Sequence, residues 1–150
     1  MTDASARLDL SITNRIADLV AEMDAVEAFL ATWSVDPADA AQVMIIVDEI
    51  ASNVIKAAWP AGGEHRFHIG LHMAGAPGAL TLSLHCVDDG IAFDPTQAAA
   101  PDLDLDLDDR MPGGLGLFMV REMSDTMEYS RVGDQNRLAL TKRLHGAVGA

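Results

Sequence analysis

The sequence is poor in cysteine and has no long apolar run. Cys86 is the one cysteine among 150 residues, so no internal disulfide can form, and a reducing cytoplasm is the expected setting. No apolar run approaches the roughly 20 residues that span a bilayer. The N-terminal residues lack the basic start and apolar core of a signal peptide. We therefore expect a cytoplasmic protein without membrane contact.

Basic side chains are also scarce. The chain has 10 Lys and Arg against 23 Asp and Glu, which gives a net charge of -13 at pH 7. A field of that sign repels nucleic acids and anionic lipids and favours a basic protein partner. Nucleotide binding is not excluded, because a phosphate site needs local backbone amides rather than a favourable net charge.

What is present is ordinary globular composition, with 49% hydrophobic and 22% charged residues. The length predicts a single domain over residues 1–150. Apolar residues recur every three or four positions over residues 16–33 and again over 37–59, which predicts two amphipathic helices. Asp36 suits the N-cap of the second helix, and Pro37 suits its first turn.

Strands are predicted by short alternating runs bounded by turn residues. A short strand is expected at residues 8–12, and hairpins are expected from 67–73 with 80–87 and from 126–132 with 137–144. A third helix is expected at 115–123, whereas 94–112 shows no convincing element. The order predicts an α+β fold, a two-layer α/β sandwich with helices on one face of a mainly antiparallel sheet.

One candidate site lies on the second helix, where Glu49 and Asn53 interrupt an apolar segment. A spacing of four places both side chains on one helical face. A carboxylate beside an amide oxygen can hold a hard cation and orient a hydroxyl group. The alternative interpretation is a solvated polar edge of the helix.

Two glycine-containing segments are further candidates. Asp88, Asp89 and Gly90 follow an apolar strand, and Gly113, Gly114 and Gly116 lead into a helix. The first segment can aim a carboxylate into a cleft, and the second can offer free amides to phosphate. The alternatives are a polar strand-end turn and a flexible loop end.

The sequence does not favour a protein-held calcium or zinc ion. The acidic run 102–109 fails the EF-hand pattern, because Leu107 and Gly113 stand where glycine and glutamate are required. His68 and His72 would share a strand face, but no third zinc ligand is evident. A solvated acidic loop is the favoured interpretation of the run.

In order and spacing, these motifs resemble the Bergerat-type (GHKL) ATP-binding domain of gyrase, histidine kinases and MutL. Residues 49–53 are similar to its N box, 88–95 to its G1 box and 114–117 to its G2 box, with residues 94–113 as the ATP lid. The resemblance covers about residues 8–144.

Among these proteins, the chain most resembles the small RsbW-like anti-sigma-factor serine kinases. The segments that carry this likeness are 113–121, Asp125, 136–138 and 142–144. The resemblance implies a protein-serine kinase and anti-sigma factor that uses ATP and Mg²⁺. Implied partners are a STAS-type anti-sigma-factor antagonist and a sigma factor, and the implied assembly is a homodimer. Alternatives are a nucleotide-gated binding module without phosphotransfer and an ATP hydrolase.

The resemblance also implies residue roles. Glu49 would be the general base, Asn53 would bind Mg²⁺, Asp88 would accept from the adenine amino group, and Gly90 would let the base approach the strand end. The other implied nucleotide-binding residues include the phosphate-binding amides and two cations that balance phosphate charge; together they are Lys56, Ala57, Phe93, Arg110, Gly113, Gly114, Leu115, Gly116 and Leu117.

The chain departs from the family pattern at three positions. Ala57 stands where a histidine is common in the N box, and Ala92 replaces the second glycine of the G1 box. The threonine that helps to bind adenine from the late hairpin corresponds to Ala139, with Thr141 two positions on.

Overall fold

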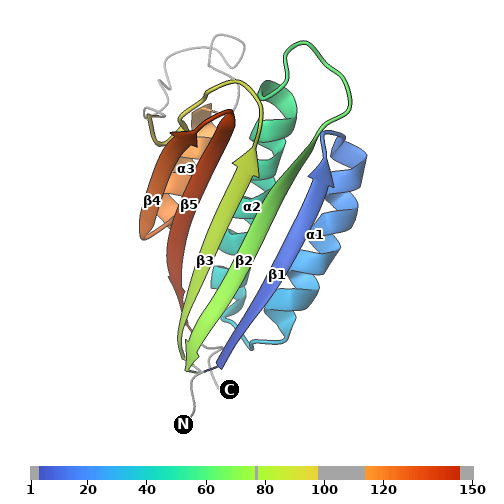
Figure 1. Ribbon diagram of the computed structural model, residues 1–150. Coiled ribbons are helices and arrows are strands. Elements are labelled where there is room, and N and C mark those ends of the chain that lie inside the picture. Colours follow the sequence, from blue (N-terminus) through green and yellow to red (C-terminus); the bar gives the residue numbers. More distant parts are fainter. Residues whose placement is uncertain (1–3, 77, 98–113, 146–150) are drawn as a thin grey trace.

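The computed structural model describes residues 4–76, 78–97 and 114–145. These residues form five strands, three α-helices and one short 3-10 helix (Figure 1). The elements in chain order are β1 (Ala4–Thr13), α1 (Ile16–Ala31), α2 (Pro37–Ala57), β2 (Arg66–Ala76), β3 (Ala79–Asp88), η1 (Pro95–Gln97), α3 (Gly114–Met123), β4 (Thr126–Val132) and β5 (Gln135–Leu144).

The strands form one sheet in the order β1-β2-β3-β5-β4, and each neighbouring pair is antiparallel. Figure 1 shows the three helices together on one face of this sheet. The predicted two-layer α+β sandwich is therefore confirmed. Among the described residues, no helix is long and apolar enough to cross a membrane.

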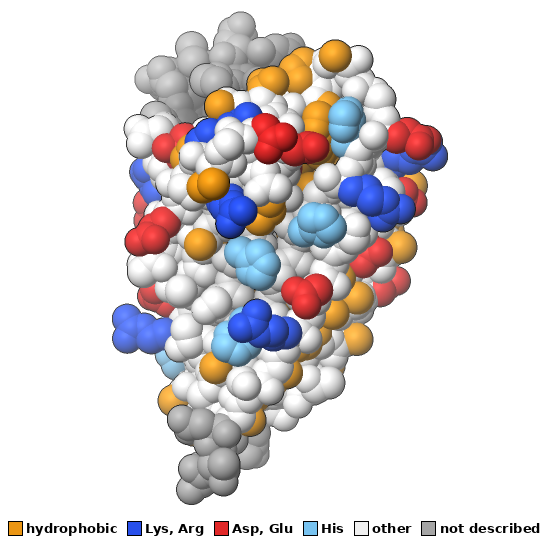
Figure 2. All heavy atoms as spheres, viewed as in Figure 1, with side chains coloured by type: hydrophobic (Ala, Val, Ile, Leu, Met, Phe, Trp, Pro, Cys, Tyr) orange, Lys and Arg blue, Asp and Glu red, His pale blue; other side chains and the backbone are white. Residues whose placement is uncertain are grey.

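The core lies between the two layers. The predicted apolar stripe of α2 is buried there, as are alternate residues of the strands. The opposite face of the sheet is uncovered and carries histidine, arginine and acidic side chains between small polar ones (Figure 2). His68, His72 and His85 belong to this outer face, because their neighbours in each strand point into the core.

Local interactions explain where α2 begins and ends. The Asp36 carboxylate accepts from the backbone N–H of Ala38 at 2.8 Å, and Pro37 occupies the first turn, as predicted. The helix was expected to reach Trp59 but ends at Ala57. Trp59 lies beyond this end. Its ring stacks on His65 with 4.6 Å between ring centroids, and its Nε1–H donates to Asp89 at 3.1 Å.

The expectation of no element after Asp94 is wrong over the short η1 helix. The Asp94 carboxylate accepts from both the backbone N–H (2.8 Å) and the hydroxyl (2.6 Å) of Thr96, and this local cap closes the turn. Most of the expected lid, residues 98–113, lies outside the described residues.

A buried lysine links three elements. Lys142 on β5 is 7% exposed, and its Nζ donates to Oε1 of Gln42 on α2 at 2.6 Å and to the carbonyl of Met123, the last residue of α3, at 2.8 Å. Carbonyls at a helix C-terminus lack partners within the helix and attract positive charge. Lys142 therefore anchors the C-terminal end of α3 to the sheet and to α2.

A second link joins the first turn of α2 to the end of β5. The Asp39 carboxylate accepts from the backbone N–H of His145 at 2.8 Å and lies 2.9 Å from its Nδ1. Burial alone would raise the pKa of Asp39, but the His145 hydrogen bonds, the His145 charge and the Lys142 charge lower it below its ordinary value. The charged form of Asp39 is therefore stabilised in the folded protein.

Replacing Asp39 with alanine is expected to lower the free energy of unfolding at pH 7 by about 1–3 kcal/mol, because the His145 N–H loses a charged acceptor. Since the folded pKa is lowered, this contribution is fully present above the unfolded pKa of about 4 and is lost as pH falls through the folded value. Urea unfolding at pH 7 and pH 3 measures it. The control is Asp24→Ala, which removes an exposed carboxylate of α1 that bonds to no described residue. Equal losses for both variants at pH 7 would contradict the prediction.

Candidate functional site

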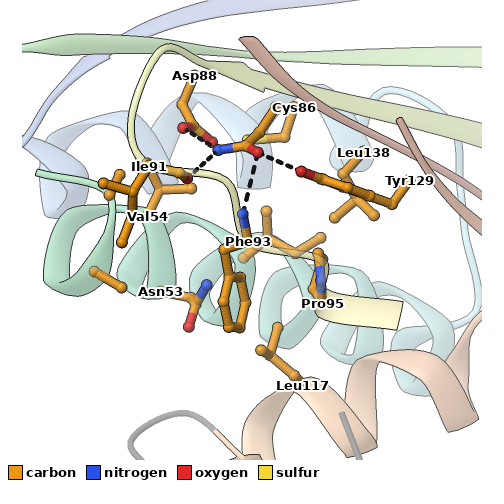
Figure 3. Close-up of a pocket in the computed structure, with 14 residues that line it drawn as sticks. Asn53, Val54, Cys86, Asp88, Ile91, Phe93, Pro95, Leu117, Tyr129 and Leu138 are labelled. Atoms are coloured by element: carbon orange, nitrogen blue, oxygen red, sulfur yellow. Dashed lines mark hydrogen bonds between the residues drawn. The ribbon is translucent and has the colours of Figure 1, made fainter. Parts of the chain in front are cut away.

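A cavity opens between α2, α3 and the sheet strands β3, β5 and β4 (Figure 3). Apolar side chains predominate in its wall, and four polar side chains converge on it, which is the usual make-up of a small-molecule site. The lining residues are Ile50, Asn53, Val54, Ala57, Ala58, Cys86, Asp88, Ile91, Phe93, Pro95, Leu117, Tyr129, Asn136 and Leu138.

Among the described residues of this wall, Asp88 alone carries a carboxylate, and it is 8% exposed. Its Oδ1 accepts from the backbone N–H of Gly90 and from Nδ2 of Asn136, both at 2.9 Å. Its Oδ2 accepts no hydrogen bond from the described residues. One oxygen is thus held by the protein, and the other can accept from a ligand in the cavity.

Asn136 on β5 faces Asp88 across the β3–β5 pair and is 7% exposed. Its Nδ2 also donates to the carbonyl of Ile91 at 2.7 Å, and its Oδ1 accepts from the N–H of Phe93 at 3.3 Å and the hydroxyl of Tyr129 at 2.5 Å (Figure 3). The sequence reasoning missed Asn136 and Tyr129 as site residues. An available signal was the position of Asn136, an amide in line with the inward-pointing Leu138 and Leu140.

Gly90 is required by packing within the protein. A Cβ atom at this position would fall 2.4 Å from both the Cβ and the carbonyl oxygen of Ala58, at the end of α2. The loop is held against the same residue, because the N–H of Ile91 donates to the Ala58 carbonyl at 2.8 Å. The suggested role of Gly90, to let a base approach, stays a prediction.

Replacing Gly90 with alanine is expected to lower the free energy of unfolding by about 1–3 kcal/mol, the usual cost of overpacking. Ala58→Gly in the same chain removes the clashing Cβ atom and leaves the clashing carbonyl group, so it should restore only part of the loss. Urea unfolding of wild type, both single variants and the double variant measures this coupling. A Gly90→Ala variant as stable as wild type would show that the loop moves away at no cost.

A close approach of α2 and α3 lies next to the cavity, at Glu49 and Gly116. A Cβ atom on Gly116 of α3 would fall 1.9 Å from Oε2 and 2.5 Å from the carboxyl carbon of Glu49. The Glu49 carboxylate therefore lies directly against the first turns of α3. Asn53, one turn further along α2, lines the cavity, as does Leu117, the residue after Gly116. The predicted base, metal ligand and glycine segment are thus brought to one end of the cavity.

The other predicted residues divide into four groups. Ala57 and Phe93 line the cavity, whereas Lys56 is exposed on α2 and is not among the lining residues. Gly114 and Leu115 are the first residues of α3, where backbone amides have no partner within the helix. Arg110 and Gly113 lie outside the described residues.

Family comparison identifies the domain type. Residues 12–142 match the histidine kinase-like ATPase domain family. The chain belongs to that family. It is also similar to the serine/threonine-protein kinase BtrW of Bordetella bronchiseptica, with 36% identity over 97 residues. That alignment covers 65% of this chain and 66% of the kinase, just under two thirds of its length.

The family makes the chain a kinase-type ATPase domain, and ATP binding follows from it. The cavity has the features that ATP requires, since an apolar wall with an inward carboxylate suits a purine and the amides at the start of α3 suit phosphate. Cys86 in the wall is no nucleophile here, because burial, together with the nearby Asp88 charge, raises the pKa of its thiol. In the described part of the ATPase domain, no three His, Cys, Asp or Glu side chains could hold a metal.

The expectation about the late hairpin of the ATPase domain needs correction. Ala139 is exposed, and Thr141 pairs its hydroxyl with that of Thr126 at 2.6 Å on the uncovered face of the sheet. Strand alternation places both on the side opposite the cavity. The β5 residues that line the cavity are Asn136 and Leu138.

Proposed function

We propose that this ATPase domain is a protein-serine kinase and anti-sigma factor that transfers the γ-phosphate of ATP to a serine of a STAS-type antagonist. The observation that carries the proposal is the contact of the Glu49 carboxylate with Gly116. It places a potential base where the start of α3 can hold phosphate. The similarity to a protein named as a serine/threonine kinase supports the same reaction.

The residues at this end of the cavity fit a magnesium ion bound together with ATP. Asn53 lines the cavity and makes no hydrogen bond to a described residue, so its amide oxygen is available as a hard ligand (Figure 3). Mg²⁺ keeps several waters and is usually shared between one or two protein oxygens and the phosphates. When bound, it would neutralise charge on the transferring phosphate.

The proposed phosphotransfer requires few further groups from this chain. The serine hydroxyl gives its proton to Glu49 while its oxygen bonds to the γ-phosphorus, the bond from that phosphorus to the β,γ-bridging oxygen breaks, and ADP leaves. Asp88 holds the adenine end of the nucleotide and the α3 amides hold the phosphate end, so the reacting atoms are aligned.

The proposed function implies two protein partners and an assembly. The antagonist docks as substrate, and a sigma factor binds in the alternative complex; a homodimer is the proposed assembly. Phosphorylation adds charge to the antagonist surface and releases it, so that partners exchange. The net charge of -13 is compatible with a basic surface on one of them.

The deciding experiment incubates the chain with ATP labelled at the γ-phosphate and a STAS-domain antagonist from the same genome, with Mg²⁺ or with EDTA. Label on one serine of the antagonist, dependent on Mg²⁺, is the expected result. Release of free phosphate without labelled protein would indicate an ATP hydrolase. Partner binding that responds to ATP without any transfer would indicate a nucleotide-gated binding module.

A further inference from the structure

We propose that Asn136 and Tyr129 orient the Asp88 carboxylate and thereby set the preference of this site for adenine over guanine nucleotides. The inference rests on the proposed contact of Asp88 with adenine and does not depend on phosphotransfer. Asn136 acts here as a positioning residue, because it works through Asp88.

The first step is that Asn136 has no capacity left for a ligand. An amide nitrogen has two hydrogens, and those of Asn136 are used by Asp88 Oδ1 and the Ile91 carbonyl. Its carbonyl oxygen accepts from the Phe93 N–H and the Tyr129 hydroxyl. A group that is saturated by the protein can affect a nucleotide only through the groups that it holds.

The second step is that the amide has one possible orientation. Two acceptors, Asp88 and the Ile91 carbonyl, lie on its nitrogen side, and two donors, the Phe93 N–H and the Tyr129 hydroxyl, lie on its oxygen side. A flipped amide would oppose like groups at three of the four contacts, since only the Tyr129 hydroxyl could accept instead of donate. Tyr129 contributes by donating from β4, so it holds the nitrogen of Asn136 toward Asp88.

The third step concerns Asp88. Because Gly90 and Asn136 both donate to Oδ1, the rotation of the carboxylate is fixed and Oδ2 is left as a pure acceptor at the cavity. Adenine has an exocyclic amino donor on its six-membered ring, where guanine has an oxygen. A fixed acceptor attracts the first and repels the second, and mismatched buried polar groups discriminate strongly.

The same amide also shapes the wall of the cavity. It fixes the Ile91 carbonyl and the Phe93 N–H, and the side chains of both residues line the cavity. Arg131 on β4 secures the loop further along, because its Nη1 donates to the Gly90 carbonyl at 2.8 Å. Loosening Asn136 should therefore affect the carboxylate and the loop together.

The mild test is Tyr129→Phe, which removes one hydroxyl. Loss of one neutral hydrogen bond is expected to weaken ATP binding about 3- to 10-fold and to lower the ATP-to-GTP affinity ratio by a similar factor. Calorimetry with each nucleotide measures both. The matched control is Thr126→Val, which removes a hydroxyl pair across the same two strands but on the uncovered face, and should change neither value.

The stronger test is Asn136→Asp, which replaces the donor with an acceptor beside Asp88. Two carboxylates at hydrogen-bond distance repel each other strongly when both are charged, so the pair is stable only while it shares one proton. The other ionisable groups around the described site are Cys86 on β3, Asp89 in the loop, and Tyr129 and Arg131 on β4. Relative to wild type at the same pH, the variant should bind ATP within a few-fold at pH 6 and at least about tenfold more weakly at pH 8.5.

Asp88→Asn separates the possible failures, and thermal melting confirms that each variant is folded during the measurement. If Asp88→Asn binds ATP as wild type does, the adenine contact of Asp88 is wrong and this proposal fails with it. If Asp88→Asn loses binding but Tyr129→Phe and Asn136→Asp keep wild-type affinity and selectivity at both pH values, only the positioning role is wrong. Equal weakening of ATP and GTP by Tyr129→Phe would overturn the selectivity role.

Discussion

Replacing Glu49 with glutamine is expected to lower serine phosphorylation by roughly 10²–10⁴-fold, the usual contribution of a positioned general base. The glutamine side chain keeps the shape that packs against Gly116 and removes the proton acceptor. Because the cavity wall is unchanged, ATP affinity should stay near that of wild type, and partner binding should persist. Initial rates with labelled ATP, together with calorimetry, separate the two effects.

The matched control is Asp48→Asn, which makes the same change of charge one residue earlier on α2. Asp48 is exposed, and its described hydrogen bond comes from the nearby hydroxyl of Ser52 at 3.4 Å. This variant should phosphorylate at the wild-type rate. If wild type and Glu49→Gln transfer phosphate equally well, Glu49 is not the base.

Gly116→Ala should produce a comparable kinetic defect by a different route. The new methyl group would fall 1.9 Å from Oε2 of Glu49, and since this is the end of a half-buried, flexible side chain, the carboxylate moves rather than the backbone. Alanine is favoured over glycine in a helix by up to about 1 kcal/mol, so the fold should be no less stable. Displacing a base by about 1 Å can cost about 10²-fold in rate.

The double variant shows whether the two changes act on the same group. If Gly116→Ala acts by displacing Glu49, adding it to Glu49→Gln should slow phosphotransfer little further. If the rate reductions of the two single variants multiply in the double variant, Gly116 has a separate role, for example in holding phosphate. A single Gly116→Ala variant with the wild-type rate would show that the carboxylate position seen here is not the catalytic one.

Periodicity and turn residues were sufficient to predict the helices, most of the strands and the layer arrangement. The α2 stripe of Val43, Val47 and Ile50 lies in the core as expected, and Asp36 caps that helix. The errors concern the ends of elements and the short η1 helix. The α2 helix was expected to reach Trp59 and to stop at Pro60, but it ends at Ala57, and beyond that end the Trp59 ring stacks on His65 and donates to Asp89.

The site was only partly predictable, because its parts depend on different kinds of information. Asp88 and Asn53 lie in motifs with recognisable spacing, and both line the cavity. Asn136 and Tyr129 reach the same place through the β3–β5 and β4–β5 registers, which local patterns do not specify. The reason for glycine at position 90 depends on Ala58, a contact that exists only after the chain has folded.

The buried lysine at the far end of α3 has a mechanical consequence. A helix of 10 residues is about 15 Å long. Its C-terminal end is fixed, because Lys142 binds the Met123 carbonyl, whereas its other end carries Gly116 and the Glu49 contact.

A tilt of α3 about its Met123 end would therefore move the end that carries Gly116. Gly116 lies about 10 Å along the helix from Met123, so a tilt of roughly 5–6° about that end moves it by about 1 Å. That is the scale of displacement on which catalytic alignment depends. In the proposed mechanism, the alignment of the reacting groups would therefore also depend on the contact between the Lys142 ammonium and the Met123 carbonyl, at the other end of α3.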